Sequence, residues 1–97
     1  MKKHEVVWST RAIGQRYIIS EWYKEKLGKI ASVHFNNDLN ETIDAISIMP
    51  TIGTFSAKFS SERFQYYTIP IHKRYILIYR FTAQRVYIFA IRSTLMK

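Results

Sequence analysis

The segment RYILIYRFTAQRVYIFAIR, residues 74–92, decides the fold. It contains two runs rich in β-branched and aromatic residues, Arg74–Phe81 and Arg85–Ile91, and such runs favour β-strands. The three residues between the runs, Thr82-Ala83-Gln84, have the length of a hairpin connection. We therefore predict two neighbouring antiparallel strands.

The sequence on the N-terminal side of this pair extends the predicted sheet. A third run of the same kind, Arg63–Ile71, is joined to the pair through His72-Lys73, again a hairpin-sized connection. Pro70 has no N–H to donate to a ladder, so it belongs at a strand end, an edge or a bulge. A short β-like stretch, Glu5–Trp8, lies near the start of the sequence.

The residues between these β segments have helical spacing. Ser9 or Thr10 can cap a first helix that Gly28 is placed to end, and its apolar residues are Ala12, Ile13, Ile19, Trp22, Tyr23 and Leu27. A second helix is expected over Lys29–Met49, with Pro50 forcing its end and an apolar stripe of Ala31, Phe35, Leu39, Ile43 and Ile46. We predict one α+β domain over residues 1–97, in the order β-α-α-β-β-β, with a helical hairpin on one face of a mainly antiparallel sheet.

Both faces of the predicted sheet are apolar. Alternation places Ile76, Ile78 and Arg80 opposite Tyr75, Leu77, Tyr79 and Phe81, and divides the last strand into Val86, Ile88 and Ala90 against Tyr87, Phe89 and Ile91. Two helices cover only one face, and a free face normally carries polar residues. We expect another protein chain to cover the second face, unless the N-terminal segment, the 51–62 loop or sheet curvature does so.

The charge of the sequence is uneven. The net charge is +8, and residues 1–49 hold seven Lys or Arg against six acids, whereas residues 50–97 hold eight against one. The second half therefore favours an anionic partner, either a nucleic acid or an acidic protein segment, although a basic surface that aids solubility is the simpler alternative. The absence of cysteine and of a long apolar segment leads us to expect a cytoplasmic protein.

The sequence resembles the RelE/ParE toxin superfamily of type II toxin–antitoxin systems, and in particular its ParE-like, plasmid stabilisation members. The resemblance lies in Trp8-Ser9-Thr10-Arg11-Ala12, in Pro50-Thr51-Ile52-Gly53, and in the strands RYILIYR (residues 74–80) and VYIFAIR (residues 86–92). It implies the RelE/ParE-like fold and a cognate antitoxin with an acidic or amphipathic segment that wraps the open sheet face. Operator DNA is then bound only through the antitoxin. For the antitoxin-binding face we predict Tyr67, Ile69, Ile71, Ile76, Ile78 and Arg80.

The resemblance leaves two activities open. RelE-like members cleave messenger RNA on the ribosome, and ParE-like members inhibit DNA gyrase. The positions that correspond to basic residues of the nucleases hold Tyr67, Ile69 and Ile76, while the C-terminal arginine corresponds to about Met96, with Arg92 or Lys97 as substitutes. This departure favours a ParE-like toxin without a cofactor that arrests growth by binding its target.

A RelE-like endonuclease remains the alternative, with weak catalytic candidates Arg63, Arg74, Arg80, Arg92 and Tyr67. A third reading is a nucleic-acid-binding module without toxicity. The histidines give weaker evidence of a functional site. His4 and His34 are isolated and lack metal-ligand spacing, and His72-Lys73-Arg74 is typical of a solvated hairpin turn.

Overall fold

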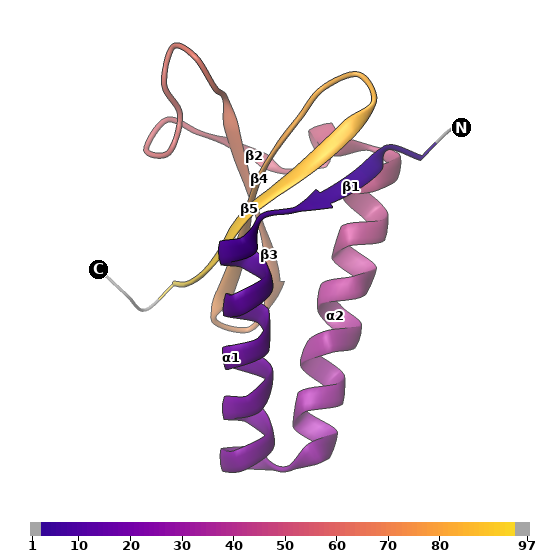
Figure 1. Ribbon diagram of the computed structural model, residues 1–97, viewed down its shortest axis with the longest axis vertical. Coiled ribbons are helices and arrows are strands. Elements are labelled where there is room, and N and C mark those ends of the chain that lie inside the picture. The colour runs from indigo at the N-terminus through magenta and orange to yellow at the C-terminus, as the bar shows by residue number, and fades with distance from the viewer. Residues whose placement is uncertain (1–2, 95–97) are drawn as a thin grey trace.

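The computed structural model describes residues 3–94 as two helices packed against a five-stranded sheet (Figure 1). The elements follow the predicted order, with one short strand added before the last three. They are β1 (Glu5–Trp8), α1 (Thr10–Leu27), α2 (Lys29–Ile48), a 3₁₀ turn (Pro50–Ile52), β2 (Thr54–Ser56), β3 (Tyr66–His72), β4 (Tyr75–Phe81) and β5 (Arg85–Ser93). None of the helices in residues 3–94 is long and apolar enough to cross a membrane.

The strands lie in the order β1-β5-β4-β3-β2. β1 is parallel to β5, and every other neighbouring pair is antiparallel. The helical hairpin covers one face, as Figure 1 shows, so the predicted fold is confirmed. The strand β2 was missed because Thr54–Ser56 is too short for a visible alternation.

Local signals set the ends of the two helices. The Ser9 side chain accepts a hydrogen bond from the Ala12 amide at 3.0 Å, as expected of an N-cap. Gly28 has φ of 97° between the helices, a conformation that glycine adopts without the steric cost of a Cβ. After the C-cap residue Met49, Pro50 begins the 3₁₀ turn, and Asn36, Asn37 and Asp38 do not interrupt α2.

The main core lies between the hairpin and the helix-covered face of the sheet. Its largest fully buried side chains are Phe35, Leu39, Ile46, Leu77, Tyr79, Val86 and Ile88. The Tyr79 hydroxyl donates to the Pro50 carbonyl at 2.6 Å and accepts from the Gly53 amide at 3.0 Å. A Cβ on Gly53 would lie 2.3 Å from that hydroxyl oxygen, so the close approach requires glycine.

The apolar residues of α1 do not all reach the core. Ala12 and Tyr23 are buried and Ile19 packs on the core, but Ile13, Trp22 and Leu27 are exposed. The reason is a polar seam between the helices, which turns the helix so that other residues face α2.

Hydrogen bonds between side chains form this seam. The Arg16 guanidinium donates to Asn36 Oδ1 at 3.0 Å and to Asn40 Oδ1 at 2.8 Å. The hydroxyls of Ser20 and Ser32 lie 2.8 Å apart, and the Asn36 amide donates to Ser20 at 2.9 Å. Partial burial lowers the pKa of Arg16. The helices therefore meet through satisfied polar groups, which leaves several apolar side chains of α1 free for other contacts.

Candidate binding surface

Strand register places the predicted antitoxin-binding residues on two faces of the sheet. Tyr67 pairs with Tyr79, and Ile69 pairs with Leu77, so these residues share the helix-covered face, where Ile71 is also buried. Ile76, Ile78 and Arg80 alternate with Leu77 and Tyr79 and lie on the other face, which we call the open face. The expectation that all six line one face is therefore wrong; whether any of them binds an antitoxin stays a prediction.

A β-bulge changes the predicted faces of β5. The register with β4 shifts between Ile78, which pairs with Ala90, and Tyr79, which pairs with Ile88. Phe89 is the extra residue. As a result Ala90 lies on the open face with Ile78, and Ile91 pairs with Leu77 on the helix-covered face, the reverse of simple alternation.

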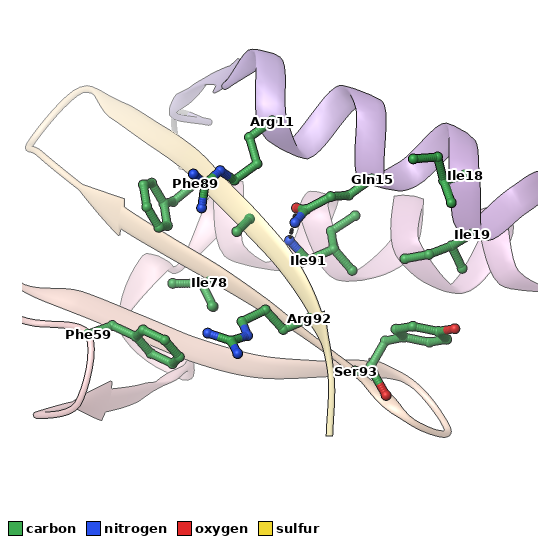
Figure 2. Close-up of a pocket in the computed structure, with 12 residues that line it drawn as sticks. Arg11, Gln15, Ile18, Ile19, Phe59, Ile78, Phe89, Ile91, Arg92 and Ser93 are labelled. Atoms are coloured by element: carbon green, nitrogen blue, oxygen red, sulfur yellow. Dashed lines mark hydrogen bonds between the residues drawn. The ribbon is translucent and has the colours of Figure 1, made fainter. Parts of the chain in front are cut away.

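The centre of the open face is buried, whereas side chains around it are partly exposed. Ile78 is 0 % exposed although it does not belong to the main core. Phe59, from the connection between β2 and β3, lies on the same side of the sheet as Ile78 and Arg92 (Figure 2). The 51–62 loop thus reaches the centre of this face, where its Phe59 lines the same cavity as Ile78, while Phe64 and Phe89 stay exposed.

A groove runs between α1 and the second half of β5 (Figure 2). It has a volume of about 630 Å³, within the usual range of about 300–1,000 Å³ for binding pockets. Helix α1 contributes Arg11, Gln15, Ile18 and Ile19. The sheet and the loop contribute Phe59, Tyr75, Ile78, Phe89, Ala90, Ile91, Arg92 and Ser93. We call this cavity the α1–β5 groove.

Cations stacked on aromatic rings dominate the open face. The Arg80 guanidinium lies 4.1 Å from the ring centre of Tyr87 and 4.5 Å from that of Phe64. Arg92 lies 5.5 Å from Phe59. The remaining cation–ring pairs of this surface are Arg11 with Phe89, Arg63 with Phe64 and Lys58 with Phe59.

These cations are available to an anionic partner. Within residues 3–94 the ion pairs are Lys3–Asp44, His72–Asp38 and Arg85–Glu5, none of which involves a stacked cation of the open face. A guanidinium that stacks on a ring keeps its edge N–H groups free for a carboxylate or a phosphate. The open face therefore suits binding to an acidic or phosphorylated surface.

The weak catalytic candidates are only partly brought together. Arg63, Arg80 and Tyr67 line a hollow of about 390 Å³ at the strand ends, beside Glu62. Arg92 lies in the α1–β5 groove, and Arg74 lies at the β3–β4 turn, where its carbonyl accepts from the Thr94 amide at 2.6 Å. Met96 and Lys97 lie outside the described residues.

The histidines of interest lie away from the open face. His72 bonds Asp38 at 2.5 Å between Nδ1 and Oδ2, and its ring packs edge-on against Tyr23 and Phe35. His4 Nδ1 lies 3.1 Å from the Ser47 carbonyl oxygen. Among residues 3–94 there is no group of three His, Cys, Asp or Glu side chains placed to hold a metal ion.

Sequence reasoning named Ile78 and Arg92 among the residues that line the α1–β5 groove but missed others. Gln15, Ile18 and Phe59 carried no signal, because the groove depends on where β1 ends and where a loop folds back. The spacing of the apolar residues in α1 also could not show that Trp22 is exposed.

The fold and the open face define a small α+β binding domain with a cationic aromatic surface. The sequence matches the family described as "ParE toxin of type II toxin-antitoxin system, parDE" over residues 6–97, so the chain belongs to this family. No curated protein sequence matches it.

Solved structures share the fold at low sequence identity. The chromosomal ParDE toxin–antitoxin system from P. aeruginosa matches with a TM-score of 0.75 and 13 % identity, covering 94 % of this chain and 96 % of that one. The YoeB dimer from Staphylococcus aureus has a TM-score of 0.61, 15 % identity and coverage of 94 % and 97 %. The YoeB/ParE toxin from Agrobacterium tumefaciens has a TM-score of 0.58, 15 % identity and coverage of 92 % and 96 %.

Proposed function

We propose that this toxin arrests growth by binding a macromolecular target, with DNA gyrase as the first candidate, and that a cognate antitoxin neutralises it. In this proposal residues 1–97 act as one domain in the cytoplasm. Loss of the antitoxin then inhibits growth, and a plasmid that carries the pair is stabilised.

The observation that carries this proposal is the pair of rings around Arg80. Tyr87 and Phe64 hold the guanidinium at 4.1 and 4.5 Å from their centres, which restricts it before a partner arrives. The residues that replace the expected nuclease cations also support it. Tyr67 and Ile69 face the helix-covered core, where a cation would be desolvated, and Ile76 is apolar.

The antitoxin part of the proposal is supported by the family and by the open face itself. The P. aeruginosa structure is that of a ParDE system, and the bare rings and cations here suit an acidic or amphipathic segment. Operator DNA is bound only through the antitoxin in this scheme.

A RelE-like endonuclease is the second candidate, and one hollow favours it. Glu62 and Tyr67 are side chains capable of proton transfer, and Arg63 and Arg80 could hold a phosphate between them. In this alternative the toxin cuts messenger RNA on the ribosome.

The two activities are separated by expressing the chain inducibly in bacteria without an antitoxin and mapping messenger RNA ends. We expect growth arrest with intact transcripts, together with inhibition of DNA supercoiling when the purified chain is added to purified gyrase. Cuts in phase with codons would reject the binding-only activity in favour of the endonuclease. Normal growth would reject a toxin of either type.

Arg80 is tested against a matched arginine elsewhere. Arg80→Ala should weaken binding to the target about tenfold or more, because a hydrogen bond to a charged group contributes about 1.5–3 kcal/mol. Arg74→Ala removes the same charge at the exposed β3–β4 turn and should change binding by less than about twofold. Equal effects of the two variants would show that net charge alone drives binding.

A further inference from the structure

One side of α1 carries a row of exposed residues that points away from α2. At about 3.6 residues per turn the row spans an arc of roughly 80°. It lies opposite Arg16 and Ser20, whose side chains bond to α2. We call this row the α1 face, and its exposed residues are Arg11, Gly14, Ile18, Trp22 and Glu25.

The α1 face is symmetrical about Ile18. The steps along the chain from Arg11 to Glu25 are three, four, four and three residues, so the row has the same spacing in both directions. When a helix packs antiparallel against its own copy about a two-fold axis, residues equally distant from that axis on opposite sides meet. With the axis at Ile18, Arg11 meets Glu25 of the second copy and Gly14 meets Trp22 of the second copy.

The charges that meet in this arrangement are opposite. Neither Arg11 nor Glu25 takes part in an ion pair within residues 3–94. Arg11 lies 5.7 Å from the ring centre of Phe89, and a stacked guanidinium keeps its edge N–H groups free. Because the two-fold axis repeats every contact, the pairing forms two ion pairs between the copies.

Gly14 leaves the space that a large side chain of a second copy needs. A glycine inside a helix costs stability relative to alanine, and a Cβ at Gly14 would meet no heavy atom of the described chain within 4 Å. Packing within residues 3–94 therefore does not require this glycine. Trp22 is 47 % exposed, and its indole can lie against a helix only where the facing residue is small.

We propose that two copies of this chain associate through their α1 faces, antiparallel and about a two-fold axis at Ile18. Ile18, which is 68 % exposed, contacts Ile18 of the second copy, and Tyr17, which is 67 % exposed, covers one flank of the contact. The last turns of α1 extend beyond the strands in Figure 1, so they are open to a second helix. This inference does not depend on the proposed function.

The occupant is a second copy because the α1 face supplies its own complement. An acidic segment or a nucleic acid would match Arg11 but would place a like charge near Glu25, and an apolar helix would leave both charges without partners. A single helix pair buries less than the roughly 800 Å² per partner of a standard interface. We therefore expect a weak dimer, with a dissociation constant on the order of 100 µM.

Sedimentation equilibrium of the full chain between about 10 µM and 1 mM, at about 0.15 M salt, tests the association. The wild-type chain should show a reversible monomer–dimer equilibrium. Ile18→Asp should weaken it at least about tenfold, because two carboxylates would meet at the axis, and circular dichroism should show an unchanged fold. A chain that stays monomeric up to 1 mM would overturn the proposal, as would a dimer that Ile18→Asp leaves intact.

Exchange of the charges tests the antiparallel register. Arg11→Glu and Glu25→Arg should each weaken the dimer about tenfold or more, because each replaces two attractions by two repulsions. An equal mixture of the two variants should form mixed dimers with about the wild-type affinity, since every contact again joins opposite charges. Lys24→Glu makes the same charge change outside the α1 face and should alter the affinity less than about threefold. A mixture no tighter than either variant alone would reject this register.

Gly14→Leu separates a role in packing between copies from a role in folding. Leucine favours a helix more than glycine does, so the thermal unfolding temperature of the monomer, measured at about 10 µM, should rise. The dimer should weaken at least about tenfold, because the new side chain occupies the space assigned to Trp22 of the second copy. If Gly14→Leu leaves the dimer unchanged, the proposed packing is wrong.

Discussion

Both faces of the sheet carry aromatic and branched side chains, but they use them differently. On the helix-covered face Leu77 and Tyr79 are fully buried against Phe35 and Leu39. On the open face the rings of Tyr87 and Phe64 support the guanidinium of Arg80. Apolar composition therefore builds a core where helices cover it, and a platform for charge where they do not.

The largest expected difference in stability lies within the open face, between Asp substitutions at Ile78 and at Ile76. Ile78→Asp should prevent folding or cost at least about 3 kcal/mol, because a carboxylate would be desolvated beneath the loop. Ile76→Asp, at a partly exposed site of the same strand, should cost about 1 kcal/mol. Urea unfolding followed by circular dichroism measures both, and equal costs would show that the loop does not cover Ile78 in solution.

The second comparison takes one residue from each face. Leu77→Ala should lower the free energy of unfolding by about 2–5 kcal/mol, the usual cost of a core cavity. Phe89→Ala, at a side chain 38 % exposed on the open face, should cost about 1 kcal/mol or less. Its larger effect should be on partner binding, since its ring supports Arg11. Similar losses of stability from both variants would contradict the division between core and platform.

The third comparison concerns the buried hydroxyl of Tyr79. Tyr79→Phe should cost about 1–3 kcal/mol, because the Pro50 carbonyl and the Gly53 amide lose their partner. Desolvation by burial raises the pKa of Tyr79 above its ordinary value, and this outweighs the Gly53 hydrogen bond that lowers it.

The pH dependence follows from the sign of that shift. The folded state holds the Tyr79 proton more tightly than the unfolded state, so the stabilisation is complete below the unfolded pKa of about 10 and is lost as pH rises from there through the folded pKa. Wild-type protein should therefore lose more stability than Tyr79→Phe when urea unfolding is compared at pH 9 and above pH 10. Parallel losses would show that other groups, such as Tyr23, dominate the alkaline transition.

The helix ends and strand β4 could be predicted from local sequence signals. Ser9, Gly28 and Pro50 set the helix ends through local capping and backbone geometry, and these signals act over a few residues. The period of two in Arg74–Phe81 identified β4, within a family resemblance that extends over most of the chain. The exposure of Ile13, Trp22 and Leu27 on α1 could not be foreseen, because α1 meets a row of Asn and Ser on α2 that is distant in sequence.

The sequence by itself determined the order of the elements, the excess of positive charge and the presence of two apolar rows on each strand. Only the tertiary structure decided which rows share a face, because pairing Tyr67 with Tyr79 and inserting Phe89 as a bulge set the register between strands. It also decided that β1 stops at Trp8 and leaves the edge of β5 beside Gln15. Alternation is local, whereas register and coverage arise from contacts between distant residues, and so the surface on which a partner would act follows from packing.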